Sequence, residues 1–397
     1  MSWLEGWQYR KSHEIEGSTA GAVTNYQIRI TVHYGSGTDS GEHVYLNGKC
    51  RTDFGDIRFT DSDGVTELSY WIEEKVDGDY AVFWVKVPSI PASPENTTIY
   101  IYYGKSDAIT TSNGDDTFVC FDDFEDADIV EWSGDTDKAS IVTSPIKSGT
   151  YALRFYDPDI GIYWIYWSGL DIDNVCIRTW IRASHDGGDC GIVFRWINTN
   201  NYYNVVFYLG SNYLKMFKKI NGSSTEIASS SFNVTNNVWY LLEVYAYGSN
   251  LSAKVYDVNK NLLAEVSTTD TSLTSGSVGF ESNVNAGSAG YAYFDEFRVR
   301  KYIKPEPTHG VWGSEEQIIY KIYGYTLDAN GNPLPNCTVW LFRTSDKQFI
   351  DETISDENGY YEFTVSDTTT EYFIRAHKDD TPNIFGTTDR NLKGVAL

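Results

Sequence analysis

Carboxylates are the side chains of this 397-residue sequence whose type and spacing could do chemistry. They form two groups, one at Asp122, Asp123 and Glu125 and the other at Asp295 and Glu296. Hydrolysis of a glycosidic bond needs two carboxyl groups held about 5–10 Å apart across that bond. Neither group has a Glu-x-Asp-x-x-Glu spacing, and no Gly-x-Ser-x-Gly motif accompanies the six histidines. The sequence therefore predicts a protein that is not an enzyme, with a glycan-processing accessory protein as the weakest alternative.

Aromatic and amide side chains are candidates for a different role, which is binding. The sequence holds 30 Tyr and 12 Trp, and the run Tyr163-Trp-Ile-Tyr-Trp167 is denser in rings than a half-buried strand needs. Strand alternation leaves either Trp164 and Tyr166 or their neighbours facing outward, where rings stack on sugars or seal a protein interface. Packing against a neighbouring domain is the alternative. The predicted glycan or partner contacts are Trp164, Tyr166, Asn200, Asn201, Tyr202 and Tyr203.

The charge of the chain excludes several partners. It carries 31 basic and 55 acidic side chains, a formal net charge of −24. Nucleic acids and anionic lipid surfaces both require basic surface, so neither is an expected partner. No apolar run approaches the ~20 residues of a membrane span, so membrane insertion is not expected either. The acidic surface favours neutral or cation-bridged glycans over anionic ones.

Five cysteines are spread along the chain at Cys50, Cys120, Cys176, Cys190 and Cys337. None forms a CxxC pair, which argues against zinc and thioredoxin-like chemistry. A hairpin turning at Gly187 would place Cys190 opposite Ala183 or Ser184 rather than Cys176, too far for a disulfide. We therefore expect free, buried thiols.

The elements that must position these residues are β-strands. Short alternating runs, separated by Gly, Asn, Asp and Ser clusters, recur throughout the chain and helical periodicity is almost absent. Strand patterning restarts near Cys120, where Val175–Arg182 and Gly191–Ile197 are expected to form a hairpin. The predicted fold is all-β, with three tandem β-sandwiches at 1–119, 120–303 and 318–397. Two prolines and a polar composition predict a semi-rigid linker at 304–317.

Residues 1–119 resemble an uncharacterised domain that precedes concanavalin-like modules in archaeal, bacterial and viral surface proteins. The resemblance is carried by Trp7-Gln-Tyr-Arg-Lys11, Asp56-Ile-Arg-Phe-Thr60, Tyr70-Trp-Ile-Glu73, Trp84-Val-Lys-Val-Pro88 and Ile99-Tyr-Ile-Tyr-Tyr103. This domain type has no known activity, so the resemblance implies a location rather than a reaction.

Two further segments also resemble known domains. Residues 120–303, which open with Phe121-Asp-Asp-Phe-Glu125 and close with Tyr293-Phe-Asp-Glu-Phe297, resemble a concanavalin A/laminin-G-like jelly roll. Residues 318–397 are similar to carboxypeptidase regulatory-like, transthyretin-type sandwiches with an Ig-like arrangement. The carriers there are Gly331-Asn-Pro-Leu-Pro335 and Asp356-Glu-Asn-Gly-Tyr360. The jelly-roll fold serves lectins, adhesins and hydrolases alike, so it does not specify a function.

The jelly-roll resemblance implies one metal site. In that group the first and last strands lie side by side, which would bring Asp123 and Glu125 near Asp295. Hard cations take six to eight oxygen ligands, and carboxylates supply them. A structural calcium ion is therefore the expected cofactor, with solvated acids at strand ends as the alternative.

The expected function is structural and adhesive. The leader-less N-terminus and the tandem β modules suggest a virion protein of an archaeal or bacterial virus, in its tail, fibre or capsid decoration, that contacts host-surface glycan. A cellular surface adhesin or sheath protein, located extracellularly, is the alternative. Exposed aromatics predict a homo-oligomer, with a trimer favoured, or docking with other virion or surface proteins.

Overall fold

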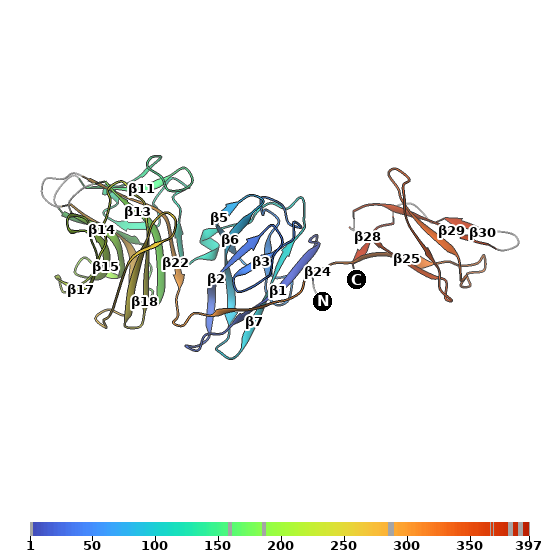
Figure 1. Cartoon of the computed structure of the whole chain (residues 1–397), viewed down its shortest axis with the longest axis horizontal. Coiled ribbons are helices and arrows are strands. Elements are labelled where there is room, and N and C mark those ends of the chain that lie inside the picture. Colours follow the sequence, from blue (N-terminus) through green and yellow to red (C-terminus); the bar gives the residue numbers. More distant parts are fainter. Residues whose placement is uncertain are drawn as a thin grey trace. The chain divides into compact units, whose positions relative to one another are not determined.

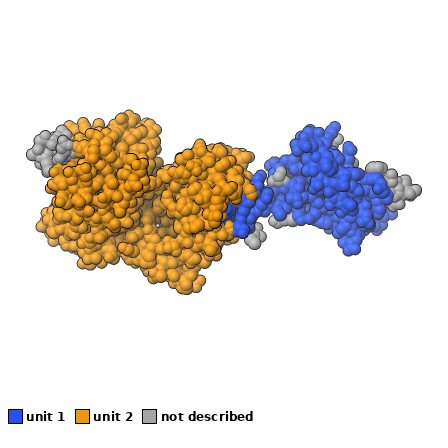
Figure 2. Space-filling view, in the orientation of Figure 1, with its two compact units in different colours: residues 1, 3–11, 314–397 blue, residues 2, 12–313 orange. Residues whose placement is uncertain are grey.

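A computed structural model describes residues 3–157, 161–184, 188–284, 290–365, 367, 369–379, 384–387 and 392–396. These residues form six β-sheets, which pair into three sandwiches (Figure 1). Two compact units contain them (Figure 2): one joins residues 3–11 to 314–397, and the other comprises residues 12–313. The predicted all-β fold with a central jelly roll is confirmed. No helix in the described part of the chain is long and apolar enough to cross a membrane.

In the N-terminal sandwich, the apolar residues that alternate along the sequence are the ones that point into the core. One sheet has the order β23-β1-β7-β4 and the other β3-β2-β6-β5. In β2, Ile28, Ile30 and Val32 point into the core and are at most 5% exposed. The strands are β1 (Tyr9–Glu16), β2 (Val23–His33), β3 (His43–Tyr45), β4 (Arg58–Thr60), β5 (Tyr70–Val76), β6 (Tyr80–Ile90), β7 (Asn96–Tyr103) and β23 (Thr308–Trp312).

The predicted linker at 304–317 is wrong over much of its length. Strand β23 pairs antiparallel with β1, with His13 opposite Trp312 and Glu16 opposite Thr308. Strand β24 (Glu316–Gln317) pairs with residues 9–10 at the other end of β1. Two prolines gave this segment its linker-like composition, but the residues after them are free to donate and accept strand hydrogen bonds. The segment therefore belongs to a sheet.

The jelly roll packs an eight-stranded sheet on a seven-stranded one. The eight-stranded sheet has the order β10-β11-β22-β13-β18-β19-β20, with β8 on β22, and the seven-stranded sheet has the order β17-β16-β15-β14-β21-β12-β9. Between them lies one apolar core that includes Phe155, Phe194, Phe280 and Phe294. Strand β8 pairs with β22, so the first and last strands do lie side by side.

The bounds of these strands are as follows. The first sheet contains β8 (Cys120–Asp122), β10 (Ala139–Val142), β11 (Ala152–Asp157), β13 (Val175–Ala183), β18 (Tyr240–Tyr247), β19 (Asn250–Tyr256), β20 (Leu262–Thr269) and β22 (Gly290–Lys301). The second contains β9 (Trp132–Gly134), β12 (Gly161–Trp167), β14 (Asp189–Asn198), β15 (Asn201–Tyr208), β16 (Tyr213–Ile220), β17 (Ser223–Ser231) and β21 (Ser277–Val284).

The predicted hairpin between Val175–Arg182 and Gly191–Ile197 is wrong. Strand β13 pairs with β18 and β22, whereas β14 pairs with β15 and β21 in the opposite sheet. Alternation cannot tell a hairpin from a crossing between sheets, because both strands bury every second residue. The predicted turn residues 185–187 lie outside the described residues. All five cysteines are free and buried, as expected.

Gly191 in β14 permits the close pairing of β14 with β15. A Cβ atom at this position would lie 1.9 Å from the carbonyl oxygen of Val205. Gly191→Ala is therefore expected to lower the free energy of unfolding by about 1–3 kcal/mol through overpacking. Gly35→Ala is the control, since no heavy atom lies within 4 Å of its added Cβ, and we expect a change within about 0.5 kcal/mol. Equal urea midpoints for the two variants would contradict this reading.

The C-terminal sandwich is small. Its sheets have the orders β28-β25-β31 and β27-β26-β29-β30 around a core that includes Ile322, Val339 and Leu341. The strands are β25 (Tyr320–Tyr325), β26 (Thr338–Arg343), β27 (Phe349–Ile354), β28 (Tyr360–Val365), β29 (Tyr372–Lys378), β30 (Ile384–Thr387) and β31 (Val395–Ala396).

Candidate functional site

A cluster of four aromatic rings lies on the outer face of the seven-stranded jelly-roll sheet. Ile165 of β12 is fully buried in the core, so Trp164 and Tyr166 point to the opposite face, where both are half-buried. Trp196 packs against both, with ring centres 5.6 Å from Trp164 and 5.4 Å from Tyr166. Tyr202 of β15 completes the cluster, 4.9 Å from Trp196.

The register of three strands brings these rings together. Trp164 lies opposite Glu281 of β21, and Tyr166 lies opposite Gly279. Gly279 in turn lies opposite Val193 of β14. A Cβ atom at Gly279 would meet the carbonyl oxygen of Ile165 at 2.1 Å, so this strand pairing requires glycine.

The buried carboxylate of Glu281 accepts hydrogen bonds from two side chains of the cluster. Glu281 is 2% exposed, and its Oε2 accepts a hydrogen bond of 2.6 Å from Trp164 Nε1. Its Oε1 accepts a bond of 2.7 Å from Asn204 Nδ2, and the Tyr202 hydroxyl donates to the same carboxylate. Burial raises the pKa of Glu281, while these hydrogen bonds and Lys219 oppose that shift. The carboxylate therefore fixes the positions of the indole and phenol rings.

Of the two polar groups beside the rings, only the Lys219 ammonium is placed to reach a ligand, because Asn204 Oδ1 is buried. Asn204 Oδ1 is buried and accepts no hydrogen bond from any residue that the structure describes. Lys219 Nζ lies 5.3 Å from the centre of the Trp164 ring and 5.5 Å from that of Tyr202. An ammonium group in this position is within cation–π range and can also donate to a hydroxyl group. The face thus combines stacking surfaces with one hydrogen-bond donor.

The predicted contact residues only partly coincide with this face. Trp164, Tyr166 and Tyr202 lie on it together. Tyr203 does not, because it is fully buried in the core between the sheets, where its hydroxyl donates to Asp270 at 2.6 Å. Assigning it a stacking role was wrong, since adjacent residues of one strand point to opposite faces.

Asn200 and Asn201 lie at the turn between β14 and β15. The carbonyl oxygen of Asn200 accepts from the backbone of Gly222, and Asn201 Oδ1 accepts from the backbone N–H of Asn221. These contacts hold two adjacent turns together. The contact role predicted for Asn200 and Asn201 stays a prediction.

Three members of the face were missed in the sequence. Trp196 follows Phe194 by two positions and should share its core-facing side, but Arg195 has a φ of +46° and the register shifts there. This bulge turns Trp196 to the outer face. Glu281 and Asn204 carry no spacing signal, because they meet only when β21, β14 and β15 are assembled.

The predicted calcium ligands do not converge on one site. Asp295 Oδ2 accepts from the backbone N–H groups of Lys147 and Ser148 at 2.7 and 3.2 Å. Glu125 Oε1 accepts from the N–H groups of Thr150 and Tyr151 at 2.8 and 2.9 Å.

Among the described residues, the acidic group whose ligand atoms lie within 4.8 Å of one another is Asp126, Asp128 and Glu131, and it does not include Asp123, Glu125 or Asp295. The assignment of a metal to those three residues is therefore corrected. Neighbouring backbone donors satisfy Glu125 and one oxygen of Asp295 instead.

Asp295 gives a pH prediction. It is fully buried, burial raises its pKa to about 7, and its Oδ1 has no hydrogen-bond partner in the described structure. A folded pKa above the unfolded value near 3.8 stabilises the fold at low pH, and this contribution is lost as pH rises through about 7. Asp295→Asn keeps the acceptor for Lys147 and Ser148 and never ionises.

We expect Asp295→Asn to melt about 2–4 °C higher than the wild type at pH 8. The difference should shrink as pH falls towards 5, because the wild-type carboxyl is then protonated as well. Thermal denaturation across pH 5–8 measures this effect. A constant difference across that range, or a less stable variant at pH 8, would be evidence against a protonated Asp295.

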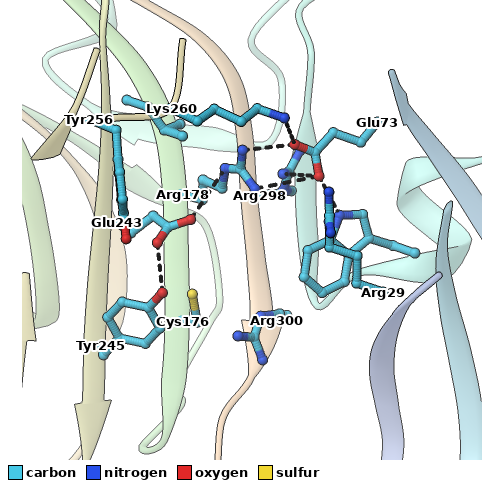
Figure 3. Close-up of a pocket in the computed structure, with 12 residues that line it drawn as sticks. Arg29, Glu73, Cys176, Arg178, Glu243, Tyr245, Tyr256, Lys260, Arg298 and Arg300 are labelled. Atoms are coloured by element: carbon cyan, nitrogen blue, oxygen red, sulfur yellow. Dashed lines mark hydrogen bonds and ion pairs between the residues drawn. The ribbon is translucent and has the colours of Figure 1, made fainter. Parts of the chain in front are cut away.

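A second arrangement of charged groups lies where the N-terminal sandwich contacts the jelly roll within residues 12–313. A cavity of about 260 Å³ opens there, lined by Arg29, Glu73, Trp84, Cys176, Arg178, Leu241, Glu243, Tyr245, Tyr256, Lys260, Arg298 and Arg300 (Figure 3). Burial raises the pKa of the Cys176 thiol to about 11, so it is not a nucleophile at neutral pH.

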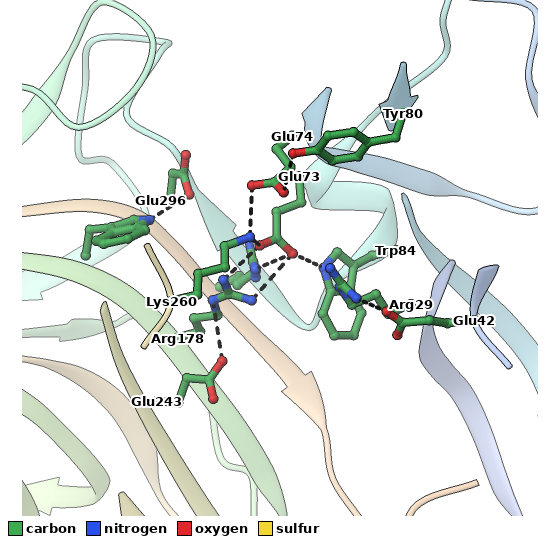
Figure 4. A network of polar contacts seen from close by, with 12 residues as sticks. Arg29, Glu42, Glu73, Glu74, Tyr80, Trp84, Arg178, Glu243, Lys260 and Glu296 are labelled. Atoms are coloured by element: carbon green, nitrogen blue, oxygen red, sulfur yellow. Dashed lines mark hydrogen bonds and ion pairs between the residues drawn. The ribbon is translucent and has the colours of Figure 1, made fainter. Parts of the chain in front are cut away.

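Glu73 is the centre of the polar network at this junction (Figure 4). Its Oε1 lies 2.8 Å from Arg178 Nη2 and 3.3 Å from Lys260 Nζ, and its Oε2 lies 3.0 Å from Arg298 Nη2. Trp84 Nε1 donates to Oε2 at 2.7 Å. The side chain of Glu73 is 4% exposed. The three cations hold the pKa of Glu73 well below its ordinary value despite this burial.

One family model matches part of the chain. Residues 53–135 match the model of a domain of unknown function, DUF2341. This match supports the resemblance of the N-terminal residues to an uncharacterised domain, and it assigns no activity. No curated protein sequence matches the chain.

Several solved structures are similar in fold. The carbohydrate binding module CBM66 from Bacillus subtilis shares 16% identity over 44% of this chain and 98% of its own, with a TM-score of 0.35. The cellulose induced protein Cip1 shares 14% identity over 46% and 97%, with a TM-score of 0.37. The Ca²⁺/Man3GlcNAc-bound VIP36 exoplasmic/lumenal domain shares 12% over 45% and 91%, with a TM-score of 0.35. Because these TM-scores lie below 0.5, the jelly-roll description rests on the strand order given above.

Proposed function

We propose that the jelly roll binds a neutral carbohydrate on the outer face of its seven-stranded sheet and does no chemistry there. The observation that carries this proposal is the pair of half-buried rings, Trp164 and Tyr166, fixed in place by Trp196 and the buried Glu281. Rigid rings at a surface are suited to stacking on the apolar faces of sugars. The Lys219 ammonium beside the rings supplies a donor for hydroxyl groups.

The hydrogen bonds of the carboxylates on this face favour binding over hydrolysis. Both oxygens of Glu281 accept from ring or amide donors of the protein, which leaves no proton for a leaving group without breaking the cluster. Asp189 lies two residues before Gly191 on the same strand, and its Oδ2 accepts from Asn283 Nδ2 at 3.1 Å. A glycosidase instead needs one carboxyl group free to transfer a proton and a second free to attack or activate water.

The charge of the ligand and the display of many copies of the protein are also part of the proposal. A net charge of −24 would repel anionic glycans, which is why a neutral ligand is proposed. An open surface site binds weakly, and display of many copies raises the overall affinity. Location on a virion, or else on a cell surface, and assembly into a trimer would supply such display. They stay predictions based on the sequence.

A glycan array tests the proposal. The full chain, multimerised on beads, is expected to retain a subset of neutral oligosaccharides. Trp164→Ala should weaken that binding at least about fivefold, the equivalent of about 1 kcal/mol of ring stacking. Tyr325→Ala, which removes a 60% exposed ring on the C-terminal sandwich, is the matched control and should bind as the wild type does. A blank array, or equal binding by wild type and Trp164→Ala, removes the glycan proposal.

A further inference from the structure

The wall of the junction cavity is positive, in contrast to the chain as a whole. Five cationic head groups line it, and the only carboxylates among the lining residues are Glu73 and Glu243. The chain carries a net charge of −24, so cations gathered in one cavity are a departure from its average surface. This cavity belongs to the eight-stranded sheet and the N-terminal sandwich, whereas the proposed glycan face belongs to the seven-stranded sheet.

Carboxylates outside the cavity lining pair with three of these cations. Arg300 contacts Glu306 through two hydrogen bonds of 2.5 and 3.0 Å. Arg29 contacts Glu42, and Lys260 contacts Glu74 at 2.8 Å. Glu42, Glu74 and Glu306 balance the charge of these three cations, but they are not among the lining residues, so the charged groups that face the cavity remain mostly cationic.

Arg298 differs from the other cations of the cavity. Its side chain is 4% exposed, yet it donates no hydrogen bond to any residue that the structure describes, and its Nη2 is among the buried atoms without such a partner. Nη2 of Arg298 lies 3.0 Å from Glu73 Oε2. The same carboxylate also forms ion pairs with Arg178 and Lys260. Leaving Nη2 of a buried guanidinium without a hydrogen bond is costly even beside a carboxylate, and an oxyanion that accepts from the guanidinium would offset part of that cost.

We propose that this cavity binds the oxyanion group of a small acidic ligand, a carboxylate, sulfate or phosphate. A guanidinium presents a planar fork of donors that matches such a group. Leu241, Tyr245 and Tyr256 add an apolar wall for the body of the ligand. The volume of about 260 Å³ is below the ~300–1,000 Å³ typical of drug-sized ligands, so the ligand is a free anion or a single acid sugar rather than a chain.

Thermal denaturation of the full chain with three probes tests this site. Sodium sulfate, sodium phosphate and sodium glucuronate are each compared with sodium chloride at matched ionic strength, and glucose serves as the uncharged reference. At about ten times its dissociation constant, a bound probe should raise the melting temperature by about 3 °C. A response to glucuronate identifies an acid sugar, and a response to sulfate or phosphate alone identifies a free inorganic anion.

Variants separate binding in the cavity from general ion effects. Arg298→Gln should abolish the shift, and Arg29→Gln, at a side chain that is 30% exposed, should reduce it at least about threefold. Lys215→Gln is the matched control, because Lys215 pairs with Glu226 on the other jelly-roll sheet, and it should respond as the wild type does. No shift with any probe beyond that of sodium chloride, or a full shift in Arg29→Gln, would overturn the proposal.

Discussion

Replacing Glu73 by alanine is expected to lower the free energy of unfolding by about 3–5 kcal/mol. Arg178 and Arg298 have side chains that are 12% and 4% exposed, and both lie against the Glu73 carboxylate. Removing that carboxylate leaves two buried guanidinium groups with less negative charge, while Trp84 Nε1 loses its acceptor. Urea denaturation of the full chain, followed by tryptophan fluorescence, measures the loss.

Glu74→Ala is the control for this prediction. Glu74 also contacts Lys260, but both side chains are more than a third exposed, so solvent and salt screen the pair. We expect a loss of about 1 kcal/mol or less. Similar urea midpoints for Glu73→Ala and Glu74→Ala would show that the buried network does not hold the N-terminal sandwich and the jelly roll together.

Glu281→Ala is expected to have the second large effect, at the proposed glycan face. Trp164 Nε1, Asn204 Nδ2 and the Tyr202 hydroxyl would each lose their acceptor. Each unsatisfied buried donor costs about 1–3 kcal/mol, so we expect a loss of about 3 kcal/mol or more in unfolding free energy. The freed Trp164 ring should also bind glycan more weakly, which calorimetric titration would record.

Glu281→Gln keeps the shape of the side chain and serves as the control. Its amide oxygen can accept from Trp164, and its NH₂ can donate to Asn204 Oδ1, which has no partner among the described residues, after the Asn204 amide turns over. Stability and glycan affinity should therefore stay near the wild-type values. If Gln is as damaging as Ala, the charge of Glu281 matters, and its role as an acceptor does not explain the effect.

Local patterns were enough to predict the strands and one face of the site. Alternation along Tyr163–Trp167 limited the outward residues to two choices, and the burial of Ile165 selects the choice with Trp164 and Tyr166 outward. Free thiols followed from the spacing of the cysteines. These inferences depend on a period of two residues within a single strand, which sequence displays directly.

Contacts between distant strands could not be predicted in this way. Trp196 reaches the site only because of a bulge at Arg195, and alternation alone would have assigned it to the core. Glu73 and Arg298 are separated by more than two hundred residues, and nothing in the sequence marks either as a partner. Asp295 was predicted as a metal ligand from the jelly-roll resemblance. Its backbone partners, Lys147 and Ser148, belong to a loop with no strand pattern, so the sequence could not show that they occupy its carboxylate.

The indole N–H resonances of the full chain report directly on whether glycan binds at the four-ring cluster. The glycan that binds best on the array would be titrated into ¹⁵N-tryptophan-labelled protein. We expect shifts at Trp164, whose Nε1 donates to Glu281, and at Trp196 beside it, with no change at Trp340 of the C-terminal sandwich or at Trp84 of the junction. Shifts confined to Trp84 or Trp340, with Trp164 unmoved at saturation, would contradict this expectation.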